Sequence, residues 1–584
     1  MADYVIVGAG SAGCVLAARL SEDPDVTVTL VEAGPPDAAE NIHVPAAFGK
    51  LFRTQYDWDY ATHHEPGCDR RRIYLPRGRT LGGSSSMNAM IYIRGNHADY
   101  DGWRDAGCDG WGFDDLLPYF LRAEDNERGA SELHGAGGPL RVSENRSRNP
   151  MSLAFVEAGV AAGHARNEDF NGPTQDGVGI YQVTQRDGQR CSTAVAYLHP
   201  ALARPNLTVE TRLLAHAITF EGTRAVGITG ERFGEPVELR AEREVILCAG
   251  AYNSPQLLML SGVGPAELLT LLEIPVVLDQ PLVGQNLQDH PSAGFTWTTP
   301  EPVSLLVAMD PAVQQEFAER GTGALTSNIG EAGGFARTSA GSPAPDVQYH
   351  ACPVMYVDEG LAAPTDHAFT LGCCVLQPRS RGSVLLASND PTAKPAIVHN
   401  YFAEAADMET MLEGLRIGAE ICAQDPMAPY THAPFMFPAS DSDADLRAHV
   451  RAHVQTLYHP AGTCAMGTVV DSELRAANQR LVDSKGDAAA AAQADDDFHR
   501  RLTADCGNEQ LLAVLDPVRQ ALVAYERVYM LSPERLARSA RQHEEIVVAL
   551  EQGDHELASA RVRENFTSAM PELEARLQDE DDED

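Results

Sequence analysis

The chain opens with an apolar stretch that leads into closely spaced glycines. Residues 5–7 (VIV) have the composition of a buried strand, and residues 8–13 (GAGSAG) follow with the spacing G-x-G-x-x-G. Residues 14–20 then predict a helix, and the alternating run 26–31 predicts a second strand that ends at Glu32. This order of strand, glycine loop, helix and strand predicts a Rossmann-type α/β unit.

The glycine loop predicts a dinucleotide site. Gly8 permits the tight turn, Gly10 lets the backbone approach a pyrophosphate, and Gly13 lets the helix pack closely on the strand. The free N–H groups at the start of the helix would face the phosphates, and the acid after the second strand would accept hydrogen bonds from a ribose. A purely structural turn is the alternative. The predicted contacts are Gly8, Gly10, Ser11, Ala12, Gly13 and Glu32.

Farther along, the apolar pattern returns to strands. Residues 206–226 alternate in the manner of strands joined by a turn, and residues 237–249 continue the pattern into an apolar end, 245–249, that predicts a buried strand of the parallel sheet. Residues 250–264 then predict a strand exit, a helix that begins at the Ser254-Pro255 pair, and a glycine that closes it.

Composition narrows the possible functions. The 584 residues carry a net charge of −38, which disfavours binding to nucleic acid or to an anionic membrane surface. No apolar run approaches the roughly 20 residues of a membrane span, and no signal peptide precedes the first strand, so we expect a cytoplasmic protein. The 11 cysteines form no regular framework, and Cys373-Cys374 lie in an apolar run, so free buried thiols are expected.

Two further segments, with the opening glycine loop, carry a family resemblance. Residues 78–88 (GRTLGGSSSMN) and 250–264 (GAYNSPQLLMLSGVG) are similar to the signature segments of the glucose-methanol-choline (GMC) oxidoreductases, which are FAD-dependent alcohol oxidases and dehydrogenases. Residues 283–290, 377–383 and 459–467 resemble the same family in the same order. The resemblance runs from residue 1 to about residue 480.

The resemblance implies where FAD binds. The glycine loop would hold the ADP part, Ala217 would offer its backbone to the adenine side, and the second loop would lie along the flavin. Met87 stands where some relatives carry a histidine bonded covalently to the flavin, and because a thioether is no such nucleophile, FAD is expected to be non-covalent. The further flavin contacts implied are Leu81, Gly83, Asn88, Ala89, Met90, Ile91 and Tyr458.

Alcohol oxidation requires a base for the hydroxyl proton while hydride leaves the α-carbon. Histidine has the pKa closest to neutrality, and His459, in the run YHPAGT, occupies the position that faces flavin and substrate in the family. His350 resembles a substrate-pocket histidine of choline-oxidising relatives, with a polar strand residue as the alternative. The sequence leaves the alcohol and the electron acceptor open.

The end of the chain departs from the family after Arg475. The final strand and the asparagine or histidine that partners the catalytic histidine do not appear, which predicts impaired turnover. The helical pattern that follows resembles the C-terminal part of the FCD domain, the effector-binding domain of GntR-type regulators. By that resemblance Asp495, His499 and His543 would hold a divalent metal, although Asn565 replaces a third histidine; histidines satisfied within a helical bundle are the alternative.

The predicted architecture is an α/β FAD-binding Rossmann-like domain with an α+β substrate domain, followed by a small all-α domain. The leading function is FAD-dependent oxidation of a small alcohol. The alternative is an inactive fusion whose helical tail binds a small carboxylate or a divalent metal. The predicted domains are FAD-binding (1–290), substrate-binding (291–445), a return to the FAD domain with the catalytic histidine (446–480), a partial FCD-like domain (481–578) and an acidic disordered tail (579–584).

Overall fold

The computed structural model describes residues 2–470 and Arg561. The chain divides into two compact units, Met1–Ser472 and Glu473–Asp584. The predictions for the helical domain at 481–578 and the acidic end at 579–584 lie outside the described residues. The predicted metal ligands Asp495, His499 and His543 lie there too.

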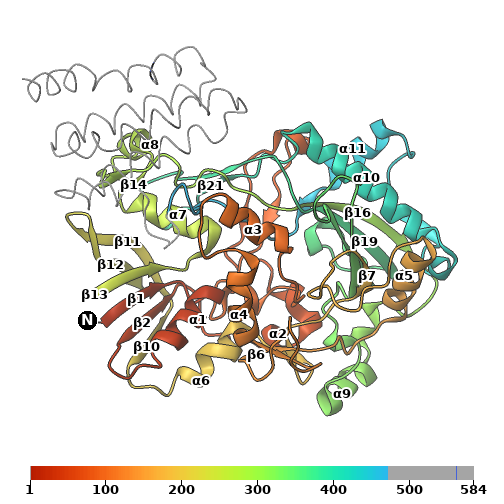
Figure 1. The fold of residues 1–584 in the computed structure, drawn as a ribbon, viewed down its shortest axis with the longest axis horizontal. Coiled ribbons are helices and arrows are strands. Elements are labelled where there is room, and N and C mark those ends of the chain that lie inside the picture. Colours follow the sequence, from red (N-terminus) through yellow and green to blue (C-terminus); the bar gives the residue numbers. More distant parts are fainter. Residues whose placement is uncertain (1, 471–560, 562–584) are drawn as a thin grey trace, which may run out of the picture. The chain divides into compact units, whose positions relative to one another are not determined.

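A six-stranded sheet carries the N-terminal glycine loop (Figure 1). Four strands are parallel, and the long fourth strand continues into an antiparallel meander. In spatial order the strands are β10 (Leu207–Thr211), β2 (Val28–Glu32), β1 (Ala2–Val7), β13 (Glu235–Leu247), β12 (Arg224–Arg232) and β11 (Leu213–Glu221). Helix α1 (Ser11–Leu20) follows the glycine loop, so the strand, loop and helix order predicted from the sequence is confirmed.

The segment 245–249 was predicted to be a buried strand, and the prediction of burial is wrong. The segment belongs to β13, but Val245, Ile246 and Leu247 are only half-buried, whereas Val5 and Ile6 of neighbouring β1 are fully enclosed. Among the described residues this part of β13 pairs with β1 alone, because β12 pairs only with its earlier half. One edge of the parallel sheet is therefore uncovered by any described strand.

The predicted helix start at Ser254-Pro255 is also wrong, because helix α7 spans Gly250–Leu260 and encloses Pro255. A proline has no N–H for the carbonyl four residues earlier, which is that of Ala251. The Thr463 hydroxyl donates to this carbonyl at 2.6 Å and supplies the missing hydrogen bond. The predicted closing glycine is present as Gly262, with a φ of +85°.

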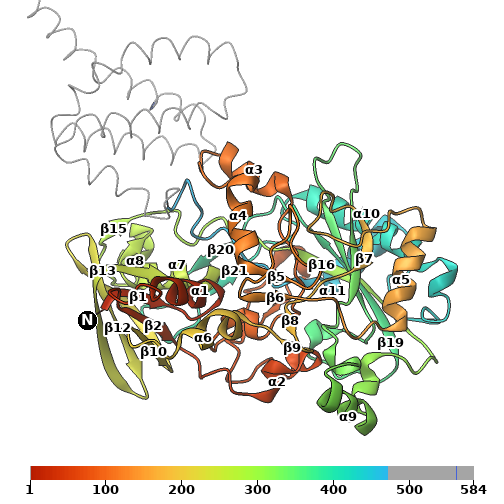
Figure 2. The same ribbon diagram turned by 60° about the horizontal axis from the view of Figure 1, so that its bottom comes forward.

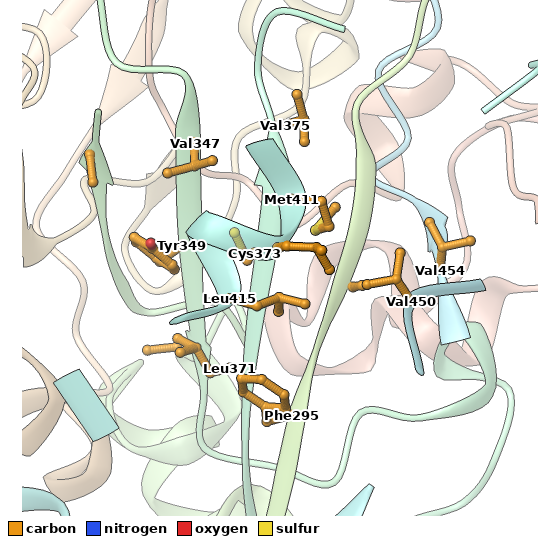
Figure 3. Packing of buried hydrophobic residues seen from close by; sticks show 14 of the residues in the cluster. Phe295, Val347, Tyr349, Leu371, Cys373, Val375, Met411, Leu415, Val450 and Val454 are labelled. Carbon is orange, nitrogen blue, oxygen red and sulfur yellow. The ribbon is translucent and has the colours of Figure 1, made fainter. Parts of the chain in front are cut away.

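The second sheet is mostly antiparallel and forms the other half of this unit (Figures 1 and 2). Its path is β22 (Ala433–Met436), β16 (Pro291–Thr298), β19 (Ala368–Val375), β18 (Val347–Cys352), β17 (Ala332–Ala336) and β7 (Gly177–Ile180), with β23 (Gln455–Thr456) also paired to β16. Strands β7 and β23 thus come from outside the predicted substrate segment 291–445. Figure 3 shows helix α10 (Ala405–Cys422) placing Met411 and Leu415 against Tyr349, Leu371 and Cys373.

Alternation along the strands gives this sheet two different faces. On β18, Val347, Tyr349 and Ala351 belong to the core under α10, so Gln348 and His350 point to the opposite face. That opposite face borders a cavity, and the polar positions of an otherwise apolar strand are directed into it.

The remaining elements are short. The helices are α2 (Glu40–His43), α3 (His97–Asp105), α4 (Phe113–Ala123), α5 (Pro150–Ala161), α6 (His199–Ala201), α8 (Ala266–Leu271), α9 (Pro311–Arg320) and α11 (Asp443–His453). The paired strands are β3 (Tyr60–Ala61) with β4 (Tyr74–Leu75), β5 (Glu124–Asn126) with β6 (Leu140–Val142), β8 (Gln185–Arg186) with β9 (Gln189–Arg190), β14 (Val263–Gly264) with β15 (Leu278–Asp279), and β20 (Ser383–Leu385) with β21 (Ala396–Val398).

Two expectations from composition concern this part of the chain. Cys373 and Cys374 are free thiols buried in β19, as predicted. Within residues 2–470, no helix is both long enough and apolar enough to cross a membrane.

Candidate active site

The glycine loop has the geometry of a cradle. Gly8 has a φ of +100°, and a Cβ atom on Gly13 would lie 1.9 Å from the Gly8 carbonyl oxygen, so both positions require glycine. A Cβ on Gly10 would meet nothing closer than 3.8 Å, which leaves space in front of that residue. Helix α1 begins at Ser11 without a side-chain cap, so its first N–H groups, including that of Ala12, are available to an anion in this space.

Glu32 lies at the end of β2 and is 5% exposed. Its Oε2 accepts from the Ala9 N–H at 3.0 Å and its Oε1 accepts from the Gly34 N–H at 2.8 Å. Burial raises the pKa of Glu32 to about 7, against the opposing effect of these two hydrogen bonds. Each carboxylate oxygen keeps one lone pair for a hydroxyl donor, which fits a ribose.

The second glycine-rich loop packs directly on the cradle. The Gly82 N–H donates to the Ala9 carbonyl at 2.8 Å, and a Cβ on Gly83 would lie 2.6 Å from the Gly10 Cα. Leu81 is buried in the core beside α1. Ala217 lies half-buried on β11 of the same sheet, where a bulge precedes its pairing with Thr229. The predicted dinucleotide residues therefore come from one sheet and its two glycine-rich loops, and the open side of Gly10 with the free N–H groups of α1 is the kind of site that binds a phosphate.

A cavity of about 1590 Å³ extends from the second glycine-rich loop, at Ser84 and Met87–Ile91, to the antiparallel sheet, and none of the residues 8–13 or Glu32 lines it. It exceeds the roughly 300–1000 Å³ of a typical small-molecule pocket, so a planar ring system and a small substrate fit together. Its walls include seven predicted site residues, namely Asn88, Ala89, Met90, Ile91, His350, Tyr458 and His459. Leu81, Gly83 and Ala217 are outside this wall.

His459 faces the cavity just after β23, and the backbone around it is held from several sides. Its N–H donates to Asp289 Oδ1 at 2.8 Å, and Arg77 Nη2 donates to the Tyr458 carbonyl at 2.8 Å. Tyr458 has a φ of +70°, which is uncommon for a side chain of this size, and its hydroxyl lies 2.8 Å from the Tyr356 hydroxyl. These contacts fix the imidazole at the cavity wall.

His459 is exposed to the cavity but is surrounded by the protein. Desolvation by these surroundings, together with the neighbouring His290, lowers the pKa of His459 to about 3, which leaves the imidazole neutral near pH 7. His459 Nδ1 lies 3.2 Å from His290 Nδ1, and burial also lowers the pKa of His290. One of these two nitrogens donates and the other accepts, so His459 Nε2 is the ring nitrogen left for a ligand.

Asp289 holds the backbone at His459 in place, and its side chain is buried, with 4% of the residue exposed. Besides the His459 N–H, it accepts hydrogen bonds from the hydroxyls of Thr456 and Tyr401, and His399 Nδ1 lies 3.5 Å away. Burial raises the pKa of Asp289, but His399 and the two hydroxyls outweigh it and hold the pKa below the usual value. Asp289 is therefore an ionised, fully satisfied anchor for the catalytic segment.

His350 reaches the same cavity from β18. Its Nδ1 is buried and makes no hydrogen bond within residues 2–470, and burial lowers its pKa to about 4. A neutral imidazole with an unpartnered nitrogen suits contact with a polar group of a ligand. Met87 also borders the cavity, with a side chain packed beside Ile42 and Leu51.

Sequence reasoning missed the residues that hold His459 in place. Asp289 and His290 lie in the run 283–290 that carried the resemblance, but no role was assigned to them, and Arg77 and Tyr356 had no signal of their own. No group of three or more His, Cys, Asp or Glu that could hold a metal occurs in the described part of the chain.

Three family models match the chain. The model "GMC oxidoreductase" matches in two parts, N-terminal at residues 2–292 and C-terminal at residues 378–482, and the FCD domain matches residues 465–568. Because the C-terminal GMC part is present, the expected loss of the family's C-terminal catalytic segment finds no support. The FCD match agrees with the resemblance of the tail.

Similar proteins and structures point the same way. Choline dehydrogenase of Mus musculus mitochondria is 42% identical, covering 82% of this chain and 84% of that protein. An oxygen-dependent choline dehydrogenase of Paraburkholderia phymatum is 45% identical over 81% and 85%. The structure of pyridoxine 4-oxidase from "Mesorbium loti" has a TM-score of 0.75 and 33% identity, covering 82% of this chain and 92% of that one.

A formate oxidase from Aspergillus oryzae, studied for its FAD modification, has a TM-score of 0.76 at 28% identity, covering 81% of this chain and 91% of that one. The glycine cradle, the cavity histidines and this level of identity lead to one conclusion: the chain belongs to the GMC oxidoreductase family, with an FCD-type segment at its C-terminal end.

Proposed function

We propose that this chain oxidises a small alcohol to an aldehyde or ketone with non-covalent FAD, and that His459 is the base. The observation that carries the proposal is an imidazole that faces the cavity and whose backbone is fixed by Asp289. FAD, when bound, accepts the hydride of the alcohol carbon. Gly8, Gly10, Ser11, Ala12, Gly13 and Glu32 would hold its ADP part, with Ala217 on the adenine side. Leu81, Gly83, Asn88, Ala89, Met90, Ile91 and Tyr458 would border the flavin.

The proton of the alcohol goes to His459 Nε2. For that nitrogen to carry a lone pair, Nδ1 must carry the ring proton, and the 3.2 Å contact with His290 Nδ1 gives that proton an acceptor. His290 is therefore a positioning residue, because it selects the tautomer of His459 that carries its proton on Nδ1. His350, on the facing strand, contacts the substrate.

Choline is the alcohol we propose first. The choline dehydrogenases of Mus musculus and Paraburkholderia phymatum are 42% and 45% identical in sequence to this chain over the matched residues. The cavity is also lined by aromatic rings, including those of Trp103, Phe335 and Tyr356, and aromatic faces attract quaternary ammonium groups.

The cofactor claim is tested by purifying the full chain and precipitating it with acid. Non-covalent FAD leaves its yellow colour in the supernatant, whereas colour retained by the pellet would contradict the proposal. A Gly10→Glu chain, with a charged side chain in the open space of the cradle, should be purified without FAD. A Gly341→Glu chain, changed in an exposed turn where an added Cβ meets nothing closer than 3.8 Å, is the matched control and should be yellow.

The FCD match gives the tail a second proposed function, binding of a divalent metal through Asp495, His499 and His543. Titration calorimetry with Zn²⁺ or Ni²⁺ on the full chain, and on a chain with His499→Ala and His543→Ala, tests it. Equal binding by both proteins would show that these histidines are not ligands.

A further inference from the structure

A buried arginine contacts the second glycine-rich loop, residues 78–88, from the side away from the cavity. Arg190, on β9, is 2% exposed. Its Nε donates to the Ile42 carbonyl at 2.7 Å and its Nη1 donates to the Ser85 carbonyl at 3.0 Å. The same Nη1 donates to Asn88 Oδ1 at 2.9 Å, and Asn88 borders the cavity. One side chain thus separates the guanidinium from the cavity.

Within residues 2–470 this cation has no negative partner. Desolvation alone acts on its guanidinium there, and its Nη2 makes no hydrogen bond with those residues. Burial lowers the pKa of Arg190 to about 9, so the guanidinium is still charged near pH 7. A buried charge without a partner is costly, and such a charge is retained where its field has a use.

Arg190 also fixes the direction of the Asn88 amide. Asn88 Oδ1 accepts from Arg190 Nη1 and from the Met90 N–H, the latter at 3.0 Å. Both partners are donors, so the oxygen must face them, and the Asn88 amide nitrogen is left as a donor on the exposed side of the residue. The amide therefore presents an N–H group, and not a carbonyl, to whatever fills the cavity.

We propose that Arg190 is a positioning residue that raises the reduction potential of the bound flavin, by its buried charge and by holding the Asn88 amide as a donor. This inference rests on the proposed binding of FAD. Two-electron reduction accompanied by one proton adds one negative charge to the flavin, and a nearby fixed cation and N–H donor stabilise that charge. The electrons come from the alcohol in turnover, and from dithionite in the test below.

The test measures the flavin reduction potential of the full FAD-bound chain by equilibration with a redox dye under dithionite titration. Arg190→Gln should lower the equilibrium constant of reduction about tenfold or more, which is about 30 mV at 29.6 mV per tenfold for two electrons. Arg190→Lys keeps the charge and should stay within about threefold of the unmodified chain. Arg186→Gln, at an exposed residue of β8 in the same hairpin, is the matched control and should leave the potential unchanged.

The outcomes separate the two claims. An unmodified chain that binds no FAD overturns the proposed function and this inference with it. An FAD-bound Arg190→Gln chain with an unchanged potential overturns the inference alone, even if the chain is less stable, because lower stability indicates a merely structural arginine. If Arg190→Gln cannot retain FAD, Arg190→Lys decides: a potential near that of the unmodified chain supports the role of the charge, and a fall of tenfold or more contradicts it.

Discussion

At the scale of single residues, the low pKa of His459 has a consequence for activity. An ordinary histidine, with a pKa near 6.5, loses its base function below that pH, whereas His459, at about 3, stays neutral. We expect the rate of alcohol-dependent flavin reduction to show no acid limb near pH 6.5 in stopped-flow measurements down to about pH 5. A limb at that pH would mean that the base is an ordinary, solvated histidine.

His290 gives a second prediction at this scale. Replacing it with leucine removes the acceptor that selects the His459 tautomer, so flavin reduction by alcohol should slow by roughly 10–100-fold, the usual cost of losing a group that orients a functional histidine. His432→Leu, at an exposed position, is the matched control. Equal rates in the two variants, both with FAD bound, would remove His290 from the mechanism.

The residues of the site that lie in short motifs were predictable from the sequence, whereas the residues that support them from distant parts of the chain were not. The cradle glycines could be picked out by their local spacing, and His459 by the resemblance of its short run to a family segment, because both lie in compact stretches of sequence. The contacts of Asp289 with His459 and of Arg190 with Asn88 join residues that are 170 and 102 positions apart. No periodicity encodes such contacts, because they depend on how the two sheets and the loops are packed.

At the scale of elements, helix α7 begins at Gly250 and not at the predicted Ser254-Pro255 pair, for a reason that a tertiary contact explains. The Ser-Pro pair is typical of a first turn, but Thr463 satisfies the Ala251 carbonyl and lets the helix begin one turn earlier. Thr463→Val keeps the shape and leaves this carbonyl without its donor, so the free energy of unfolding should fall by about 1–3 kcal/mol. Urea denaturation measures this change. Thr468→Val, at an exposed hydroxyl, should be near neutral, and an equal loss in both would contradict the account.

The segment around β5 predicts a pH dependence of stability. His134 donates to Glu124 and Asp169 at 3.0 and 2.9 Å, and these hydrogen bonds raise the pKa of His134 to about 9 despite the opposing effect of burial. A raised histidine pKa gives stability that is complete below about pH 6.5 and is lost as pH rises to about 9, roughly 3 kcal/mol in total. The difference in unfolding free energy between the unmodified chain and His134→Gln should shrink over this window. A constant difference would contradict the assignment.

At the scale of the whole molecule, the Rossmann-like unit was predictable because β1, the glycine loop, α1 and β2 follow one another within residues 2–32, although the other strands of the sheet come from residues 207–247. The second sheet was predictable only as a substrate domain by resemblance, since β7 and β23 reach it from residues 177–180 and 455–456. The uncovered edge of β13 was not predictable from its apolar residues, because burial depends on a neighbouring strand. The domain boundaries predicted at 290, 445 and 480 stay predictions.

Both the cradle and the cavity belong to the first compact unit, so this unit should bind FAD without help from the FCD-type segment. Specific cleavage or truncation after residue 482, where the C-terminal GMC match ends, should leave a yellow protein with the same flavin spectrum. Loss of the flavin on removal of residues 483–584 would show that the cofactor site extends into the FCD-type segment.

The central claim is that His459 and a bound flavin together oxidise an alcohol. The direct measurement is anaerobic mixing of the FAD-bound chain with choline and a panel of other small alcohols while the flavin absorbance is followed. The account predicts bleaching by at least one alcohol, slowed by about 10²–10⁴-fold in His459→Ala, a variant that keeps its FAD. A flavin that dithionite reduces but no alcohol does, or an equal rate in His459→Ala, would contradict it.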